Sequence, residues 1–257
     1  MFTEILRADL NDPSLGGVGG ISLVYLTLCF IVSYSLSKKF TSKERGTIVF
    51  NSTFFNSIFL PFPLIYAFYG DLSIAILFSL PVMIIHNTLG IFMASYWGHG
   101  KVERKVLVSA ITFPPMLAFL IGVIARPIFA SFVSTQFFEW LHDLGLLTVY
   151  LSLINVGLSI PLSRESLLVF RNRVTGFITL NRFLISPIIA LILMAILEPA
   201  EISRNTILIM SFMPPAFTNL VMSSRFGLDT SATSQSIFLP SLISVGIIFA
   251  LKFFAFI

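Results

Sequence analysis

The chain has 257 residues, of which 56% are hydrophobic and 11% are charged, and its formal net charge is +4. A soluble domain of this length would have to hide that much apolar surface from water, whereas a bilayer removes the requirement. The composition therefore excludes an ordinary soluble protein and predicts an all-α polytopic membrane protein. The single cysteine, Cys29, excludes a disulfide framework and a Cys/His metal site.

Taken in chain order, the sequence contains eight apolar runs of about 20 residues, the length that crosses a ~30 Å hydrocarbon core. The runs are residues 17–37, 47–68, 72–96, 105–125, 141–161, 174–197, 204–225 and 232–255. We therefore predict about eight transmembrane helices in a single membrane domain, residues 1–257. The segment 126–140 is too short to span and ends in aromatic and acidic residues, so we interpret it as interfacial.

The second and seventh runs are both interrupted by prolines. Pro61 and Pro63 lie in the second run, and Pro214 and Pro215 lie in the seventh. Proline removes a backbone donor and clashes with the preceding turn, so a continuous helix is not expected at either place. A broken span persists in a membrane only where protein buries it or where it lines a cavity. Polar residues flank both breaks, as such a cavity requires: Asn51, Ser52, Thr53, Asn56 and Ser57, and Thr218, Asn219, Ser223 and Ser224.

Similar residues follow the two interrupted runs. Tyr69-Gly70-Asp71 follows the second run and Phe226-Gly227-Leu228-Asp229 follows the seventh. The next apolar run then contains Leu80-Pro81 in one case and Leu239-Pro240 in the other. This pattern predicts an internal repeat. Interrupted apolar segments at corresponding places in two halves indicate the binding site of a transporter.

The loops between the runs differ in charge on the two sides. Alternate loops contain Lys38, Lys39, Lys43, Arg45, Lys101, Arg104, Lys105, Arg164, Arg171, Arg173 and Arg225, whereas most acidic residues lie in the other loops. The positive-inside rule makes the basic loops cytoplasmic and both termini external. The basic clusters therefore indicate membrane topology, and we expect no nucleic-acid partner.

Few polar residues lie inside the uninterrupted runs. Arg182 is a functional candidate because lipid penalises a charge, and the alternative is that its long side chain snorkels to the cytoplasmic surface. His86, Asn87 and Asn155 are interpreted chiefly as interhelical hydrogen-bonding residues. No metalloprotease, nucleophile-elbow or paired-aspartate motif is present. We therefore expect no enzyme activity, no cofactor and no metal.

Four segments resemble auxin efflux carrier (PIN-like) transporters. Residues 56–64, NSIFLPFPL, are similar to the Asn-Thr-Gly-Phe-x-Gly-x-Pro-Leu stretch in the fourth helix of that family. Residues 213–229, with Met-Pro-Pro-Ala and Arg-Phe-Gly-Leu-Asp, resemble its ninth helix. Residues 113–122 and 144–158 are similar to its sixth and seventh helices. The segments follow one another in the family's order and together cover nearly the whole chain.

The resemblance implies an inverted-repeat fold of five plus five helices, in which the broken fourth and ninth helices cross at mid-membrane. Residues 17–96 and 174–255 would be two three-helix transport units, moving as an elevator against scaffold helices in residues 105–161. Ile58 and Pro61 depart from the family by replacing glycines. The first run corresponds to the family's third helix. Its first two helices therefore have no counterpart, and we expect them to be encoded upstream or the chain to be poorly active.

The function indicated is secondary transport of small organic anions such as carboxylates across the plasma membrane, by a protein that forms a possible homodimer. A truncated, non-transporting remnant and a solute-binding membrane sensor remain alternatives. The substrate would meet the breaks and nearby polar groups: Asn56, Pro61, Pro63, Asn155, Arg182, Pro214, Pro215, Thr218 and Asn219.

Overall fold

The computed structural model describes residues 13–100, 135–158 and 172–257, together with the single residues 117, 121 and 124. Helices make up all the regular structure of these residues, apart from one isolated bridge between Phe55 and Pro215. The prediction of an all-α membrane protein is confirmed.

The first half is a set of helices with locally encoded ends: α2 (Pro13–Leu36), η1 (Ser37–Lys39), α3 (Ser42–Thr53), α4 (Pro61–Tyr69), α5 (Ser73–Ile85), η2 (His86–Gly90) and α6 (Ile91–His99). Thr41 and Glu44 form a reciprocal capping box at the start of α3. Gly70 ends α4 at a φ of 68°, a conformation that glycine adopts without strain. The elements α5, η2 and α6 form one long helix that contains a π-helical turn at η2.

The second half repeats this order of elements: α10 (Arg173–Leu180), η4 (Asn181–Ile185), α11 (Ser186–Leu197), α12 (Glu201–Ser211), α13 (Phe217–Phe226) and α14 (Thr230–Phe253). A second π-helical turn, η4, joins α10 to α11. Asn172 caps α10 and Asp229 caps α14, each by accepting a backbone N–H two or three residues ahead. Between the halves, α9 (Thr135–Leu158) packs against α4.

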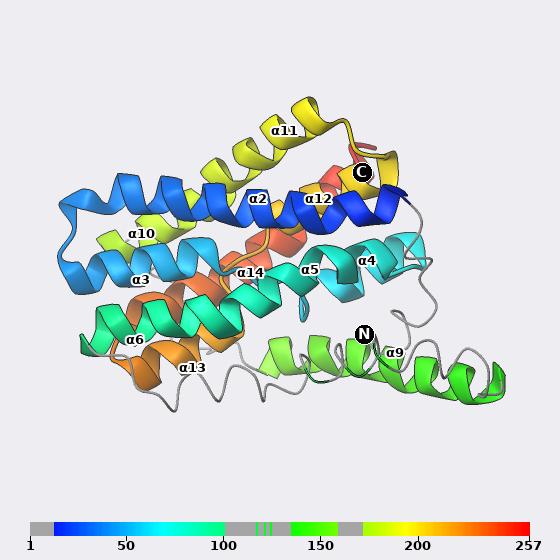
Figure 1. Cartoon of the computed structure of the whole chain (residues 1–257), viewed down its shortest axis with the longest axis horizontal. Helices are drawn as coiled ribbons and strands as arrows, with labels where there is room; N and C mark the ends of the chain where they lie inside the picture. The colour runs from blue at the N-terminus through cyan, green and yellow to red at the C-terminus, as the bar shows by residue number, and fades with distance from the viewer. Residues whose placement is uncertain (1–12, 101–116, 118–120, 122–123, 125–134, 159–171) are drawn as a thin grey trace.

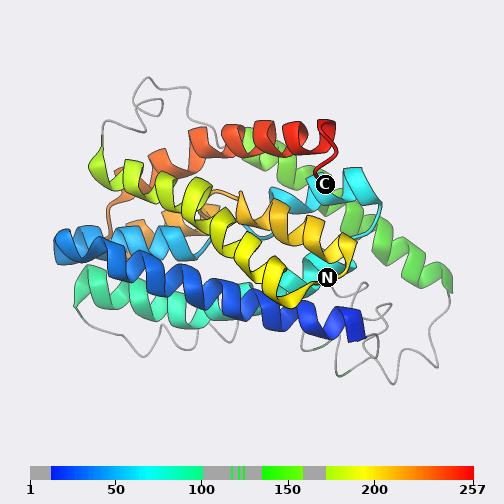
Figure 2. The same ribbon diagram turned by 90° about the horizontal axis from the view of Figure 1, so that it is seen from above.

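The two halves run in opposite directions. In Figure 1, α2 and the long helix from α5 to α6 run from right to left, whereas the helix from α10 to α11 and α14 run from left to right. Figure 2 shows the same relation from above. The α2–α3 and α13–α14 connections therefore meet at one end with the C-terminus of α6 and the start of α10. The turn after α4 and the turn after α11 lie at the other end.

Both interruptions predicted from the prolines are present. Residues 54–60 separate α3 from α4, and residues 212–216 separate α12 from α13. By length and composition, four helices of the described part could cross a membrane, and they correspond to the first, third, sixth and eighth predicted runs. They are Gly17–Lys39, Ser73–His99, Arg173–Leu197 and Thr230–Phe253.

The expected interfacial segment differs from the structure in one respect. Its last residues, from Thr135 to Trp140, are already the first turns of α9. They continue directly into the fifth predicted run because no glycine or proline interrupts the sequence there. Residues 126–134, and most of the fourth predicted run, 105–125, lie outside the described part of the chain.

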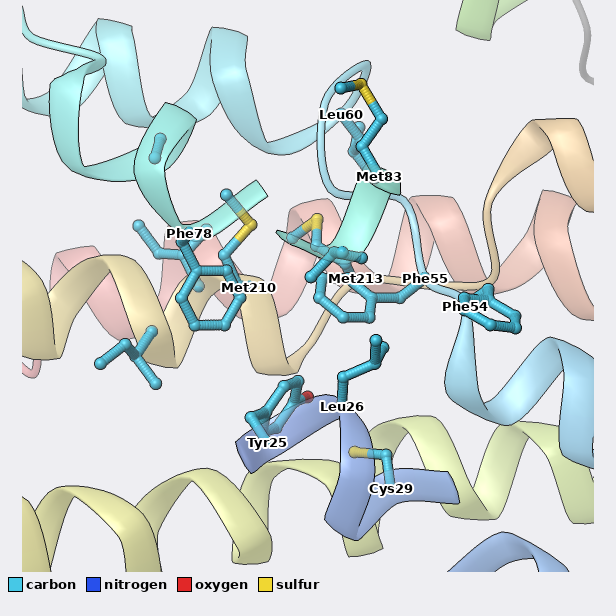
Figure 3. Packing of buried hydrophobic residues seen from close by; sticks show 14 of the residues in the cluster. Tyr25, Leu26, Cys29, Phe54, Phe55, Leu60, Phe78, Met83, Met210 and Met213 are labelled. Atoms are coloured by element: carbon cyan, nitrogen blue, oxygen red, sulfur yellow. The ribbon is translucent and has the colours of Figure 1, made fainter. Parts of the chain in front are cut away.

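The two halves interlock and share one apolar core. The packing pairs across the halves include α3 with α10, α2 with α11, α5 with α12 and α6 with α13. A Cβ atom on Gly98 would lie 1.7 Å from the carbonyl oxygen of Phe226, so α6 approaches α13 this closely only because residue 98 has no side chain. Figure 3 shows core side chains that come from the breaks themselves, with Phe54 and Phe55 from one and Met213 from the other.

Candidate functional site

The two breaks meet and pair through their backbones. The amide of Asn56 donates to the carbonyl of Pro214 at 2.8 Å, and the amide of Ala216 donates to the carbonyl of Phe54 at 3.1 Å. These two bonds make a minimal antiparallel bridge where neither chain is helical. A membrane leaves no water to satisfy exposed backbone groups, so each break supplies partners to the other.

Arg182 satisfies the carbonyls that remain at the crossover. Its side chain is completely buried. Its Nε donates to the carbonyl of Met213 at 2.8 Å, and its two terminal nitrogens donate to the carbonyls of Ser52 and Ser211 at 3.3 Å each. The guanidinium also lies over the ring of Phe55, 4.7 Å from its centroid. The side chain therefore does not reach the cytoplasmic surface, as the snorkelling alternative required.

The charge of Arg182 has no acidic partner at the crossover. The three recorded acceptors are neutral carbonyls. Acidic residues of the described part lie in turns, in the first turns of helices or in α9, and none lies on a crossover segment: Glu44, Asp71, Glu139, Asp143, Glu198, Glu201 and Asp229. A buried charge without a counter-ion is costly, so its retention in a membrane span indicates a functional site.

Asn219 links the second break to the first. Its Nδ2 donates to the carbonyl of Phe54 at 2.7 Å and to Oδ1 of Asn51 at 3.2 Å. Asn51 in turn donates to the hydroxyl of Thr233 in α14 at 3.0 Å, and that hydroxyl also lies 3.0 Å from the hydroxyl of Ser223. This buried network holds α3, α13 and α14 together. The Oδ1 of Asn219 is buried and has no hydrogen-bond partner among the described residues.

Asn56 shapes the first break from within. Its Oδ1 accepts the backbone N–H groups of Phe59 at 3.0 Å and Leu60 at 3.4 Å, which closes the turn before α4. Its Nδ2 is buried and has no partner in the described part of the chain. Buried polar atoms are normally paired, so each such orphan marks a place where a ligand atom could bind. Others on the segments around the crossover are Ser52 Oγ, Thr53 Oγ1, Thr179 Oγ1 and His86 Nε2.

The ends of four half-helices lie at the crossover. The negative potential of the two C-terminal ends is partly neutralised, whereas the positive potential of the N-terminal ends is not. The C-terminal ends of α3 and α12 present carbonyls, and Arg182 neutralises part of that negative potential. The N-terminal ends of α4 and α13 have no side-chain cap. Each helix end carries roughly half an elementary charge. The N-terminal potential is therefore left to act on a bound solute.

The structure places most of the predicted site residues together. Pro61 begins α4 and Pro63 lies in its first turn, while Pro214 and Pro215 lie inside the second break, and all four are buried. Thr218 is partly buried in the first turn of α13. Asn155 lies in α9, which packs against α4, but its side chain is outside the described part.

Sequence reasoning left three buried groups near the site unassigned. Asn51 and Ser52 were visible only as a polar run before the first break, and their roles depend on the other half of the chain. Ser186 follows the π-helical turn η4 and donates to the carbonyl of Ser211 at 3.0 Å. Its hydroxyl is itself hydrogen-bonded to Tyr25 of α2. No local sequence pattern indicates these pairings.

Comparisons with known proteins indicate the class of protein. Residues 15–251 match the model of a family described as membrane transport protein. The chain belongs to this family. The resemblance to auxin efflux carriers is thereby confirmed, and the protein is a multi-pass membrane transport protein.

Further likenesses are to two archaeal proteins, each named as an uncharacterized transporter. One, from Methanocaldococcus jannaschii, is 25% identical over 237 residues, covering 88% of this chain and 75% of the relative. The other, from Methanothermobacter thermautotrophicus, is 26% identical over 262 residues, covering 95% and 80%.

Proposed function

We propose that this transporter carries small organic anions such as carboxylates and binds them at the crossover of the two broken helices. The observation that carries the proposal is the buried guanidinium of Arg182, which has three carbonyl acceptors and no carboxylate beside it. A mobile anion is the natural counter-charge for such a group, because a fixed acid would cancel the attraction.

The hydrogen-bonding groups at the crossover suit the same class of solute. The free Nδ2 of Asn56 is a donor, and a carboxylate oxygen is an acceptor. The uncapped N-terminus of α13 adds positive potential from its backbone N–H groups. In the first turn of α4, Pro61 and Pro63 have no N–H, and the amide of Phe62 already donates to the carbonyl of Ile58. Arg182 itself is fully buried, so it acts through its field and through the carbonyls it orients. A substrate would contact Asn56, Thr218 and the backbone around the prolines.

Alternating access would move the two transport units together. Seven helix pairs of the described residues join residues 17–96 to residues 174–255, and the backbone bridge ties their breaks to each other. Separating the units would break this core, whereas α9 packs against α4 at one place. In the elevator that we propose, both units slide as one body against scaffold helices in residues 105–161. A homodimer held through this scaffold would keep it fixed in the bilayer.

Uptake into proteoliposomes tests the proposal. Purified protein would be offered radiolabelled acetate, benzoate, succinate and citrate, with choline and glucose as cationic and neutral comparators. We expect saturable uptake of at least one anion and none of choline or glucose. Uptake limited to choline or glucose would overturn the anion assignment. Tight anion binding without uptake would instead support the solute-binding sensor or the non-transporting remnant.

A matched pair of arginine variants locates the site within that assay. Arg182→Gln removes the buried charge, whereas Arg204→Gln removes an exposed arginine from α12. The first should weaken anion uptake and the second should leave it unchanged. Equal losses in both variants would indicate that the surface charge, and not the crossover, attracts the solute.

We also propose that the basic end faces the cytoplasm in the plasma membrane and that both termini are external. The proposal is supported by Lys38, Lys39 and Arg173, which lie in the connections at one end, while Asp71 and Glu198 lie in the turns at the other. The only cysteine, Cys29, is buried, so introduced cysteines can be labelled selectively. An impermeant thiol reagent should label Asp71→Cys in intact cells and spare Lys39→Cys. Labelling of Lys39→Cys alone would reverse the orientation.

A further inference from the structure

His86 lies beside the crossover, in the π-helical turn η2. Its imidazole is 6% exposed and stacks on the ring of Phe54, with centroids 4.6 Å apart and planes 13° from parallel. The ring of Phe50 lies 5.7 Å away at 55°. Phe54 is the residue whose carbonyl accepts from both Ala216 and Asn219. A titratable side chain is therefore packed directly on the first break.

The backbone around His86 is specialised to hold this stack. A Cβ atom on Gly90 would lie 3.0 Å from Cδ2 of His86 and 3.0 Å from the ring of Phe54. A side chain at residue 90 would therefore displace the two rings by a few tenths of an ångström. The π-helical turn that contains both residues is itself an uncommon local structure that is found mostly at functional sites.

Two buried atoms of complementary chemistry lack a hydrogen-bond partner near the first break. The Nε2 of His86 is buried and without a partner among the described residues, and so is the Oδ1 of Asn219. The Asn219 side chain interacts electrostatically with the imidazole. A proton on Nε2 would convert this nitrogen into a donor and satisfy both atoms with one N–H···O bond. The aromatic faces of Phe54 and Phe50 would favour the positive ring that results.

We propose that His86 is the proton-binding group of this transporter, so that the protein carries its anion together with one proton. The inference rests on the proposed function, because the coupled solute is the anion bound at the crossover. A proton would bind Nε2 from the acidic side, the N–H would donate to Asn219, and the same proton would leave Nε2 on the other side. One proton and one monovalent anion cross as a neutral pair.

The coupling follows from electrostatics and is reciprocal. A protonated imidazole adds a positive charge close to the break, so it strengthens anion binding, and a bound anion strengthens proton binding by the same factor. Anion affinity should therefore rise as the pH of the loading side falls. The proton would also be released more readily once the anion has left.

Other charged or titratable groups on the elements that pack around His86 lie at the far ends of those elements. In α3 they occupy the first turn, in α13 and α6 they occupy the last turns, and α5 contains none: Lys43, Glu44 and Arg45, Arg225, and Tyr96 and His99. Arg182 contacts α3 at the carbonyl of Ser52, which lies between Phe50 and Phe54 in the sequence. Its permanent charge would add to that of the imidazolium when the anion is present.

Gradient-driven uptake tests the inference. Proteoliposomes would receive radiolabelled gluconate, a monovalent carboxylate whose acid form is too polar to cross the bilayer readily, at equal pH on both sides, or with the outside more acidic by about one pH unit. For one proton per monovalent anion, the native protein should concentrate the anion about tenfold under that gradient. A pH-sensitive dye inside the vesicles should report acidification that depends on the added anion.

His86→Gln keeps a hydrogen-bonding side chain but cannot take up a proton. We expect this variant to equilibrate the anion at equal pH and to lose the tenfold accumulation and the anion-dependent dye signal. His99→Gln is the matched control, because His99 ends α6 and meets Phe226 edge-on with ring centroids 6.2 Å apart. It should behave like the native protein.

The outcomes separate this inference from the proposed function. Equal accumulation by the native protein and by His86→Gln would overturn the role of His86. The native protein could instead take up the anion down its concentration gradient, with no effect of the pH gradient and no dye signal. That result would overturn proton coupling and leave anion transport intact. No uptake of any anion would overturn both. If His86→Gln fails to fold, the dye measurement on the native protein and a second variant, His86→Asn, decide the question.

Discussion

Both breaks interrupt a helix, but their backbone groups find hydrogen-bond partners in different ways. The first carries its own support, because Asn56 inside the break accepts the amides of Phe59 and Leu60. The second contains both of its prolines and has no such internal cap. Its carbonyls are satisfied from other helices, by Arg182 at Met213 and by Ser244 at Phe212.

The starts of the two broken helices differ in the same way. A capping box formed by Thr41 and Glu44 begins α3. In α12 the N-cap is Ala200, which has no side-chain hydrogen bond. The comparison teaches that the first break has a local support, Asn56, in addition to its contacts with distant residues such as Arg182 and Asn219, whereas the carbonyls of the second break depend on distant residues. Changes at the second break should therefore disturb the crossover more than changes to the turn that Asn56 closes.

The largest effect is expected at Arg182. In Arg182→Gln, a single amide can serve one of the three carbonyls, and leaving two unsatisfied costs about 2–6 kcal/mol of folding free energy. The stability of Arg182→Lys should lie between that of Arg182→Gln and that of the native protein, because an ammonium lacks the planar fork of a guanidinium. Thermal unfolding in detergent measures both, with Arg204→Gln as the control. An Arg182→Gln protein as stable as the native one would contradict the dependence of the second break on this residue.

Asn219→Ala should come next. It removes the donor to Phe54 and to Asn51, which costs about 1–3 kcal/mol, and the same change should weaken anion binding by about one to two decades. A double-mutant cycle with Asn51→Ala should be non-additive because the two side chains share a hydrogen bond. Additive losses would show that the breaks are not coupled through this pair.

Two substitutions at Asn56 separate the support of the first break from solute binding. Asn56→Ala removes the acceptor of two amides and should cost about 0.5–2 kcal/mol, as loss of a helix cap does. Asn56→Asp retains an acceptor for Phe59 and Leu60 but loses the free Nδ2 donor and adds a negative charge. We expect the buried carboxylate to lower stability unless it is protonated, and anion binding to be weaker than in Asn56→Ala. Native affinity in Asn56→Asp would remove Asn56 from the site.

Ser244→Ala probes a single contact to the second break. The hydroxyl donates to the carbonyl of Phe212, and its loss should cost about 0.5–1.5 kcal/mol. Ser241→Ala is the matched control, because Ser241 bonds within α14 to the carbonyl of Ile237. If Ser241→Ala lowers the unfolding temperature as much as Ser244→Ala, the contact to the break has no special weight.

The smallest effect concerns the capping box of α3. Hydrogen bonds from the backbone and side chain of Thr41 lower the pKa of Glu44 below its ordinary value, since they favour the ionised carboxylate. The stability from this interaction is present above the ordinary carboxyl pKa and is lost as the pH falls through the lowered one. In a plot of stability against pH, Glu44→Gln should reduce the loss of stability at acidic pH. The effect should be small because the side chain is exposed. If Glu44→Gln loses as much stability at acidic pH as the native protein does, Glu44 does not cause that loss.

Part of the site was predictable from local chemistry. Proline lacks a donor wherever it occurs, so Pro61, Pro63, Pro214 and Pro215 predicted both interruptions, and the polar residues beside them indicated Asn56 and Asn219. The partners were not predictable, because hydrogen bonds such as that from Asn219 to Phe54 join residues far apart in the chain. His86 was interpreted as an ordinary polar residue between helices, since neither the π-helical turn nor its stack on Phe54 has a sequence pattern.

The sequence by itself determined that this chain is an all-α membrane protein, where its helices break and which ends are basic, because hydropathy, proline geometry and loop charge are local properties. The tertiary structure alone decided that Arg182 turns inward. From its place in the sequence the side chain could have reached water, and only the folded arrangement brings the carbonyls of Ser52, Ser211 and Met213 around it. Three acceptors at or beside the C-terminal ends of the two broken helices offset the cost of burying the guanidinium, and no stretch of sequence holds all of them.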